Sequence, residues 1–167
     1  MIEWSRAFGD APIHIHEDDR RWVMRPDPCV TFWSGETHAL RGDLRLIRSG
    51  GHFAGYQVLH WPRGAAGKGV LLAGDQPQIC MDPKQVSFMW SYPNFIPLNA
   101  AAIQCVVKSL EPLAYDRIYG AFSRAAKGSS RPTPSGSSRV RPNAIYARFM
   151  IERFPPRHAR TPAETRR

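Results

Sequence analysis

The sequence lacks any apolar run of about 18 residues, the length that a membrane-spanning helix needs, so we expect no membrane segment. The first ten residues, MIEWSRAFGD, include acids and no apolar stretch, which argues against a secretory signal peptide. Three cysteines, Cys29, Cys80 and Cys105, are too widely spaced for a disulfide framework or a C-x-x-C zinc site. These absences predict a cytoplasmic protein with reduced, mostly buried thiols.

The net charge of +9 is confined to one end of the chain. Residues 1–122 hold 12 basic and 12 acidic side chains, whereas residues 123–167 hold 11 basic and two acidic ones, so the excess there is 11 − 2 = +9. The first part therefore has no net positive field that would attract nucleic acid. We expect one folded domain over 1–122 and a basic tail rich in Ser, Pro and Arg over 123–167, whose composition is typical of disorder.

Alternation and periodicity within residues 1–122 predict strands mixed with helices, an α/β or α+β layered domain. The predicted strands are PIHIH, DLRLIR, YQVLHW, GVLLAGD, QVSFMW and YDRIYGAF, and GVLLAGD is apolar enough to be buried on both faces. The first eight residues suit the end of a helix, and EDDRRWVM suits a helical turn. The clearest helix is LNAAAIQCVVKSL, because Ile103, Val106, Val107 and Leu110 fall on one face.

The stretch PIHIHEDDRR places His14, His16 and Asp18 at the H-x-H-x-D spacing of many two-metal hydrolase centres. Its apolar lead-in is short, and Asp19 stands where a further histidine would be expected. We therefore interpret the match as accidental, with the two histidines in a strand and Asp18 at a helix start.

Two of the predicted strands are followed by residues that can bind a metal ion. His52 follows Gly50 and Gly51 just beyond DLRLIR, and Asp75 ends the strand GVLLAGD. Ligands gather at strand ends in layered α/β domains, an imidazole binds metal through nitrogen, and a carboxylate can bridge two ions. From spacing alone, a turn histidine and a Gly-Asp cap remain open alternatives. The loop from Ser91 to Asn94, SYPN, is interpreted as a plain turn rather than as a substrate-cleft wall.

The segments LIRSGGHFAGYQVLHW and GVLLAGDQPQI resemble the metallo-β-lactamase-fold hydrolase superfamily, in an uncharacterised bacterial branch, and the resemblance covers about residues 1–122. It implies an αββα sandwich with metals between two sheets. It also implies that His52 and Asp75 are metal ligands and that Asp75 is catalytic through a metal-activated water. The expected cofactor is zinc or another divalent metal such as iron or manganese, and the expected reaction is hydrolysis of an ester, thioester, amide or phosphate bond.

The resemblance also shows what is missing. The family's first cluster, H-x-H-x-D-H, and its last ligand histidine have no counterpart, so only two ligands are present and we expect weak metal binding. We expect the sandwich to be incomplete at its N-terminal side, which leaves one face of the remaining sheet open. The candidates for that apolar face are Leu59, Trp61, Phe88 and Trp90, and a homo-oligomer is the expected way of covering it.

Other functions compete with the hydrolase. One is a catalytically silent remnant of the fold that acts by self-association. Another is nucleic-acid binding through the basic tail by counterion release. We favour a neutral extension or a shifted reading frame over this nucleic-acid role for the tail. His38 and His60 are expected to be structural or exposed. The substrate itself is not indicated by the sequence.

Overall fold

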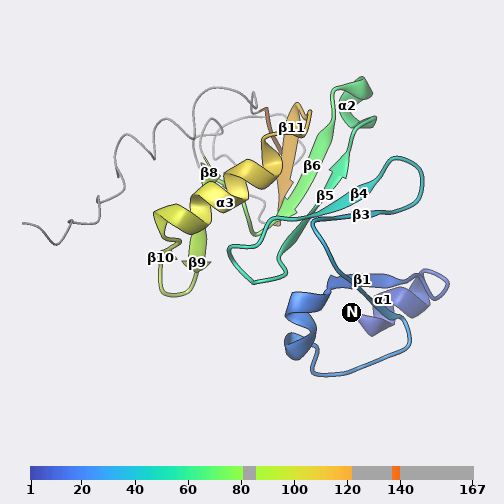
Figure 1. The fold of residues 1–167 in the computed structure, drawn as a ribbon. Coiled ribbons are helices and arrows are strands. Elements are labelled where there is room, and N and C mark those ends of the chain that lie inside the picture. The colour runs from blue at the N-terminus through green and yellow to red at the C-terminus, as the bar shows by residue number, and fades with distance from the viewer. Residues whose placement is uncertain (81–85, 122–136, 140–167) are drawn as a thin grey trace, which may run out of the picture.

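The computed structural model describes residues 1–80, 86–121 and 137–139, and it shows a mixed α+β domain (Figure 1). Its helical elements are α1 (Ile2–Ala7), the 3-10 helix η1 (Glu17–Trp22), α2 (Gly64–Gly67) and α3 (Ala100–Leu110). Its strands are β1 (Ile13–His16), β2 (Val30–Trp33), β3 (Thr37–Ala39), β4 (Arg45–Arg48), β5 (Gln57–Trp61), β6 (Val70–Gly74), β7 (Gln78–Ile79), β8 (Val86–Ser87), β9 (Met89–Ser91), β10 (Ile96–Pro97), β11 (Arg117–Gly120) and β12 (Ser137–Arg139). No helix of the described part is long and apolar enough to cross a membrane.

Six strands form the main sheet in the order β12-β11-β6-β5-β4-β3. The pair β6 and β11 is parallel, and the other neighbours are antiparallel. Within the predicted tail, residues 137–139 form the edge strand β12. The prediction of disorder for residues 123–136 and 140–167 lies outside the described residues.

One face of the sheet carries the hydrophobic core, because α3 packs across it (Figure 1). Strand residues that alternate along the sheet meet the predicted stripe of α3, in which Val106 is completely buried and Val107 lies at the margin. The buried members are Ile47, Val58, Leu71, Ala73, Phe88, Leu98, Ile103, Val106, Leu110 and Ile118. The Asn99 side chain begins α3 by accepting a hydrogen bond from the Ala102 amide at 2.9 Å. The helix predicted from periodicity is therefore confirmed.

Among the described residues, the opposite face of the sheet is covered at one end only. The small parallel sheet of β1 and β2 packs there and is held by Gln57 of β5. The Gln57 side chain accepts a hydrogen bond from the Trp33 indole at 2.7 Å and donates one to the His14 carbonyl at 2.8 Å. Toward the middle of the sheet, Leu72 and Trp61 are each 44% exposed. The expectation that the β6 strand is buried on both faces is therefore wrong, because nothing in the described part covers Leu72.

The residues predicted for an open apolar face divide into two groups. Trp61 and Trp90 are exposed and Leu59 is half-buried. Phe88 is buried, because it lies between β8 and β9 and turns into the core, where its carbonyl accepts from the Leu98 amide at 3.0 Å. The expectation for Phe88 is therefore wrong.

The cysteines are free but less buried than the sequence suggested. Cys29 and Cys80 are half-buried, and Cys105 is exposed on α3. Cys105 lies outside the apolar stripe of that helix, which explains its exposure. The expectation of mostly buried thiols is therefore wrong.

Candidate metal-binding site

His52 lies in the loop that connects β4 to β5, just beyond the C-terminal end of β4. The loop closes on itself, because the amides of Ser49 and Gly50 both donate to the Tyr56 carbonyl, at 2.8 and 3.0 Å. Gly50 and Gly51 have φ values of +63° and +90°, which only glycine adopts without strain. The two glycines that precede His52 in the sequence are therefore what allows this tight turn.

One nitrogen of the His52 ring is already oriented by the protein. Its Nδ1 lies 2.9 Å from the carbonyl oxygen of Met89, which can only accept, so Nδ1 carries the proton. Nε2 then bears the lone pair, and it has no hydrogen-bond partner among the described residues. Metal-binding histidines are commonly held in this way, with the second nitrogen donating to a backbone carbonyl.

Asp75 follows β6 and is held through its backbone by two tyrosines. Its amide donates to the Tyr56 hydroxyl at 2.6 Å, and its carbonyl accepts a hydrogen bond from the Tyr92 hydroxyl. Its half-buried carboxylate has no ion-pair or hydrogen-bond partner within the described part of the chain.

The same two tyrosines also contact His52, so they join the two predicted ligands into one cluster. The ring centroids of Tyr56 and Tyr92 lie 5.8 and 5.5 Å from that of His52. Burial, with a further contribution from the Asp75 charge, raises the pKa of Tyr56 to about 12. Burial and the same charge also raise the pKa of Tyr92. Both phenols therefore stay protonated at neutral pH, and the Asp75 charge lies close to both hydroxyls.

Sequence reasoning missed both tyrosines. Tyr92 belongs to the loop that we interpreted as a plain turn, whereas it contacts His52 and the Asp75 carbonyl. The sequence places Tyr56 in a predicted strand and gives it no other role. Its position four residues after His52, at the end of the same glycine loop, was the one available signal.

The H-x-H-x-D stretch does not join this cluster. His16 is buried, and its Nδ1 accepts from the Asp18 amide at 3.2 Å, so its Nε2 donates to the Gly35 carbonyl at 3.0 Å. Both nitrogens are thus occupied, and the nearby Asp18 carboxylate pairs with Arg48 at 2.6 Å. No group of three or more His, Cys, Asp or Glu residues that could hold a metal occurs among the described residues.

The remaining histidines also lie outside this cluster. The ring of His14 lies 5.1 Å from that of His38, and burial followed by the charge of His38 lowers the pKa of His14. His60 is buried, and its Nε2 lies 2.9 Å from the Ala114 carbonyl. His158 lies outside the described residues.

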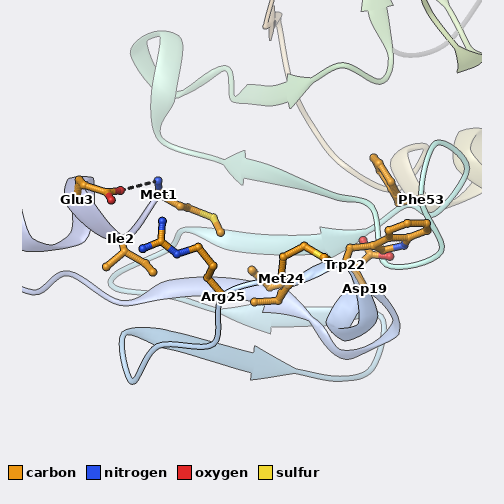
Figure 2. A pocket seen from close by; sticks show the side chains of 10 residues that line it. Met1, Ile2, Glu3, Asp19, Trp22, Met24, Arg25 and Phe53 are labelled. Carbon is orange, nitrogen blue, oxygen red and sulfur yellow. Dashed lines mark hydrogen bonds and ion pairs between the residues drawn. The ribbon is translucent and has the colours of Figure 1, made fainter.

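A largely apolar cavity of about 360 Å³ adjoins the His52 loop. Figure 2 shows Trp22, Asp19 and Phe53 at one end and Ile2, Glu3 and Arg25 at the other. Phe53 follows His52 directly, and its ring meets the edge of Trp22 at 6.0 Å between centroids. Asp19 fixes this wall to the loop by accepting from the Gly55 amide at 2.8 Å.

The structure shows an α+β domain in which His52 follows β4, Asp75 follows β6, and β5 lies between these two strands. Among proteins of known sequence, the chain is similar to the uncharacterised protein YmaE of Bacillus subtilis (strain 168), with 50% identity over 127 residues. The match covers 76% of this chain and 46% of YmaE, so the chain spans less than half of that relative. No family model matches the sequence. No solved structure matches it either.

Proposed function

We propose that the chain carries part of the metal site of a metal-dependent hydrolase with a metallo-β-lactamase-like αββα fold. The part present is the C-terminal portion of that fold, residues 1–122. The proposal rests above all on His52, whose Nδ1 proton is directed to the Met89 carbonyl while Nε2 has no hydrogen-bond partner among the described residues.

The donor types fit a divalent metal. An imidazole nitrogen and a carboxylate suit zinc, and they also suit iron or manganese. A metal held there would activate water for attack on an ester, thioester, amide or phosphate bond. Asp75 would bind the metal and orient that water, while Tyr56 and Tyr92 keep the Asp75 backbone in place.

Two protein ligands are fewer than a tight zinc site uses, so the chain alone should bind metal weakly and its hydrolysis should be impaired. The test is a Zn²⁺ titration of the full chain, followed by NMR through the backbone amide signals of residues 49–56 and 74–76. His52→Ala and Asp75→Asn should each abolish the response. His38→Ala is the matched control, because His38 is a half-buried histidine on β3, on the far side of β4 and β5 from β6.

Binding that is unaffected by both site variants would refute the proposed site. Elemental analysis that finds close to one metal per purified chain, lost in His52→Ala, would instead refute the weakness of the binding. A panel of ester, thioester and lactam substrates would then show whether any hydrolysis depends on the same two residues.

Self-association is the second candidate function, and the open face of the sheet favours it. Leu72 lies in the middle of the sheet between Leu59 and Tyr119, yet it is 44% exposed. A second copy of the chain would cover this apolar face. Nucleic-acid binding by the tail remains a prediction on residues that lie mainly outside the described ones, and salt-dependent retention on DNA, lost on truncation at 123, would test it.

A further inference from the structure

Directly after Asp75, a glutamine is fully buried with only part of its hydrogen-bonding capacity used. Gln76 is 0% exposed. Its Nε2 donates to the Gly50 carbonyl at 2.8 Å, whereas its Oε1 has no hydrogen-bond partner in the described part of the structure. The side chain therefore runs from the Asp75 turn to the loop that carries His52.

Stability alone does not explain a glutamine at this position. A buried amide oxygen without a partner is costly, so the glutamine combines one hydrogen bond with one unpaired acceptor. Methionine would fill a similar volume without that unpaired side-chain oxygen. What methionine could not supply is the bond to the Gly50 carbonyl.

That bond joins the two segments that carry the predicted ligands. Gly50 stands two residues before His52, and Gln76 stands one residue after Asp75. The contact is also close, because a Cβ placed on Gly51 would lie 2.3 Å from the Gln76 Nε2 and 2.9 Å from the Val106 Cγ2. The loop therefore rests directly on the amide and cannot move further inward.

We propose that Gln76 is a positioning residue that fixes the separation of His52 and Asp75. The inference deepens the proposed metal site and rests on it. Gln76 does not touch the metal or the substrate. Its amide holds the His52 loop at one distance from the Asp75 turn, so that the imidazole and the carboxylate face a common ion.

The main test is Gln76→Met in the full chain, with Zn²⁺ alone as the probe. We expect zinc binding at least about tenfold weaker than in the wild type, as is typical when a residue that orients a ligand is lost. We expect the midpoint of thermal unfolding to change little, because the removal of the unpaired oxygen offsets the loss of the donor to the Gly50 carbonyl. A residue with a purely structural role would lower the zinc affinity and the thermal midpoint together.

A second variant tests the same contact from the loop side. Gly51→Ala should weaken zinc binding, because its Cβ would push the loop away from Gln76. Gly67→Ala is the matched control, since Gly67 also has a positive φ, +82°, but a Cβ there would have nothing within 4 Å. Equal loss of zinc binding in both variants would mean that backbone strain, not the contact, is responsible, and would overturn the inference.

The outcomes separate this inference from the proposed function. Wild-type zinc affinity in Gln76→Met, or a loss of affinity that only follows a lowered thermal midpoint, overturns the positioning role. If the wild type shows no zinc response, the proposed function fails instead. Positioning is then judged without metal, by the tautomer of His52 and by amide exchange over residues 49–56. Faster exchange confined to that loop supports it, and unchanged exchange and tautomer in Gln76→Met overturn it.

Discussion

Removing the hydroxyl of Tyr56 tests whether the candidate site is built around this side chain. The hydroxyl accepts from the amides of Asp75 and Gln76, at 2.6 and 3.0 Å, and donates to the Ala73 carbonyl at 2.8 Å. Tyr56→Phe deletes all three hydrogen bonds and keeps the ring. We therefore expect a loss of stability that originates at the turn after β6.

The size of the loss follows from what remains paired. The Asp75 amide would have no partner in the described part of the structure, and an unpaired donor costs about 1–3 kcal/mol. The Gln76 amide keeps the Ala73 carbonyl at 3.2 Å, so the other two bonds add less. Because Asp75 is only half-buried, water offsets part of the cost. The free energy of unfolding should fall by about 2–3 kcal/mol.

Urea denaturation followed by circular dichroism measures this difference. Tyr119→Phe is the matched control, because Tyr119 is a half-buried tyrosine of the same sheet whose hydroxyl has no hydrogen bond among the described residues. The control should change stability by less than about 0.5 kcal/mol. A Tyr56→Phe variant within about 0.5 kcal/mol of the control would refute the reasoning.

Three further predictions concern the same fold. The pKa of Tyr56 is raised to about 12 and that of Tyr92 is also raised, so folding favours the neutral phenols. The stability that these two groups contribute should be fully present below about pH 10 and should be lost as the pH rises toward 12. Stability should fall less steeply with pH in Tyr56→Phe, and equal slopes would contradict this. Asn99→Ala removes the bond to the Ala102 amide and should cost about 1 kcal/mol in urea denaturation, and an unchanged midpoint would argue against the cap. Leu72→Lys should suppress self-association in sedimentation velocity while keeping the fold, and a wild type that stays monomeric at every concentration would rule the association out.

Long periodic segments were the predictable part of the fold. The helix α3 and the strands β4, β5, β6 and β11 were all expected, because each carries enough apolar positions to define its period. The strands β2, β3, β7 and β10 were not, since they have two to four residues and exist through pairing with distant segments. QVSFMW was predicted as one strand but forms two, because Phe88 turns into the core between them.

The sequence indicated His52 and Asp75 as candidate ligands, which stays a prediction, but it did not indicate the tyrosines that contact them. Glycines and strand ends mark His52 and Asp75 in the sequence, and the structure brings both to Tyr56 and Tyr92. No local pattern connects Tyr92 with a residue that lies 17 positions earlier in the chain. An apolar run such as that around Leu72 likewise does not reveal whether both faces of a strand are covered.

The parallel pairing of β6 with β11 has a consequence for how this chain folds as it is synthesised. The antiparallel strands β4, β5 and β6 are near neighbours and can assemble early, but the partner of Val70 is Arg117, which is translated only after α3. Until then, Leu71 has neither helix nor neighbouring strand on one side, and contacts this distant in sequence form slowly. The nascent protein is therefore most open to misassociation, and most in need of a chaperone, in the interval between the emergence of β6 and that of β11 from the ribosome.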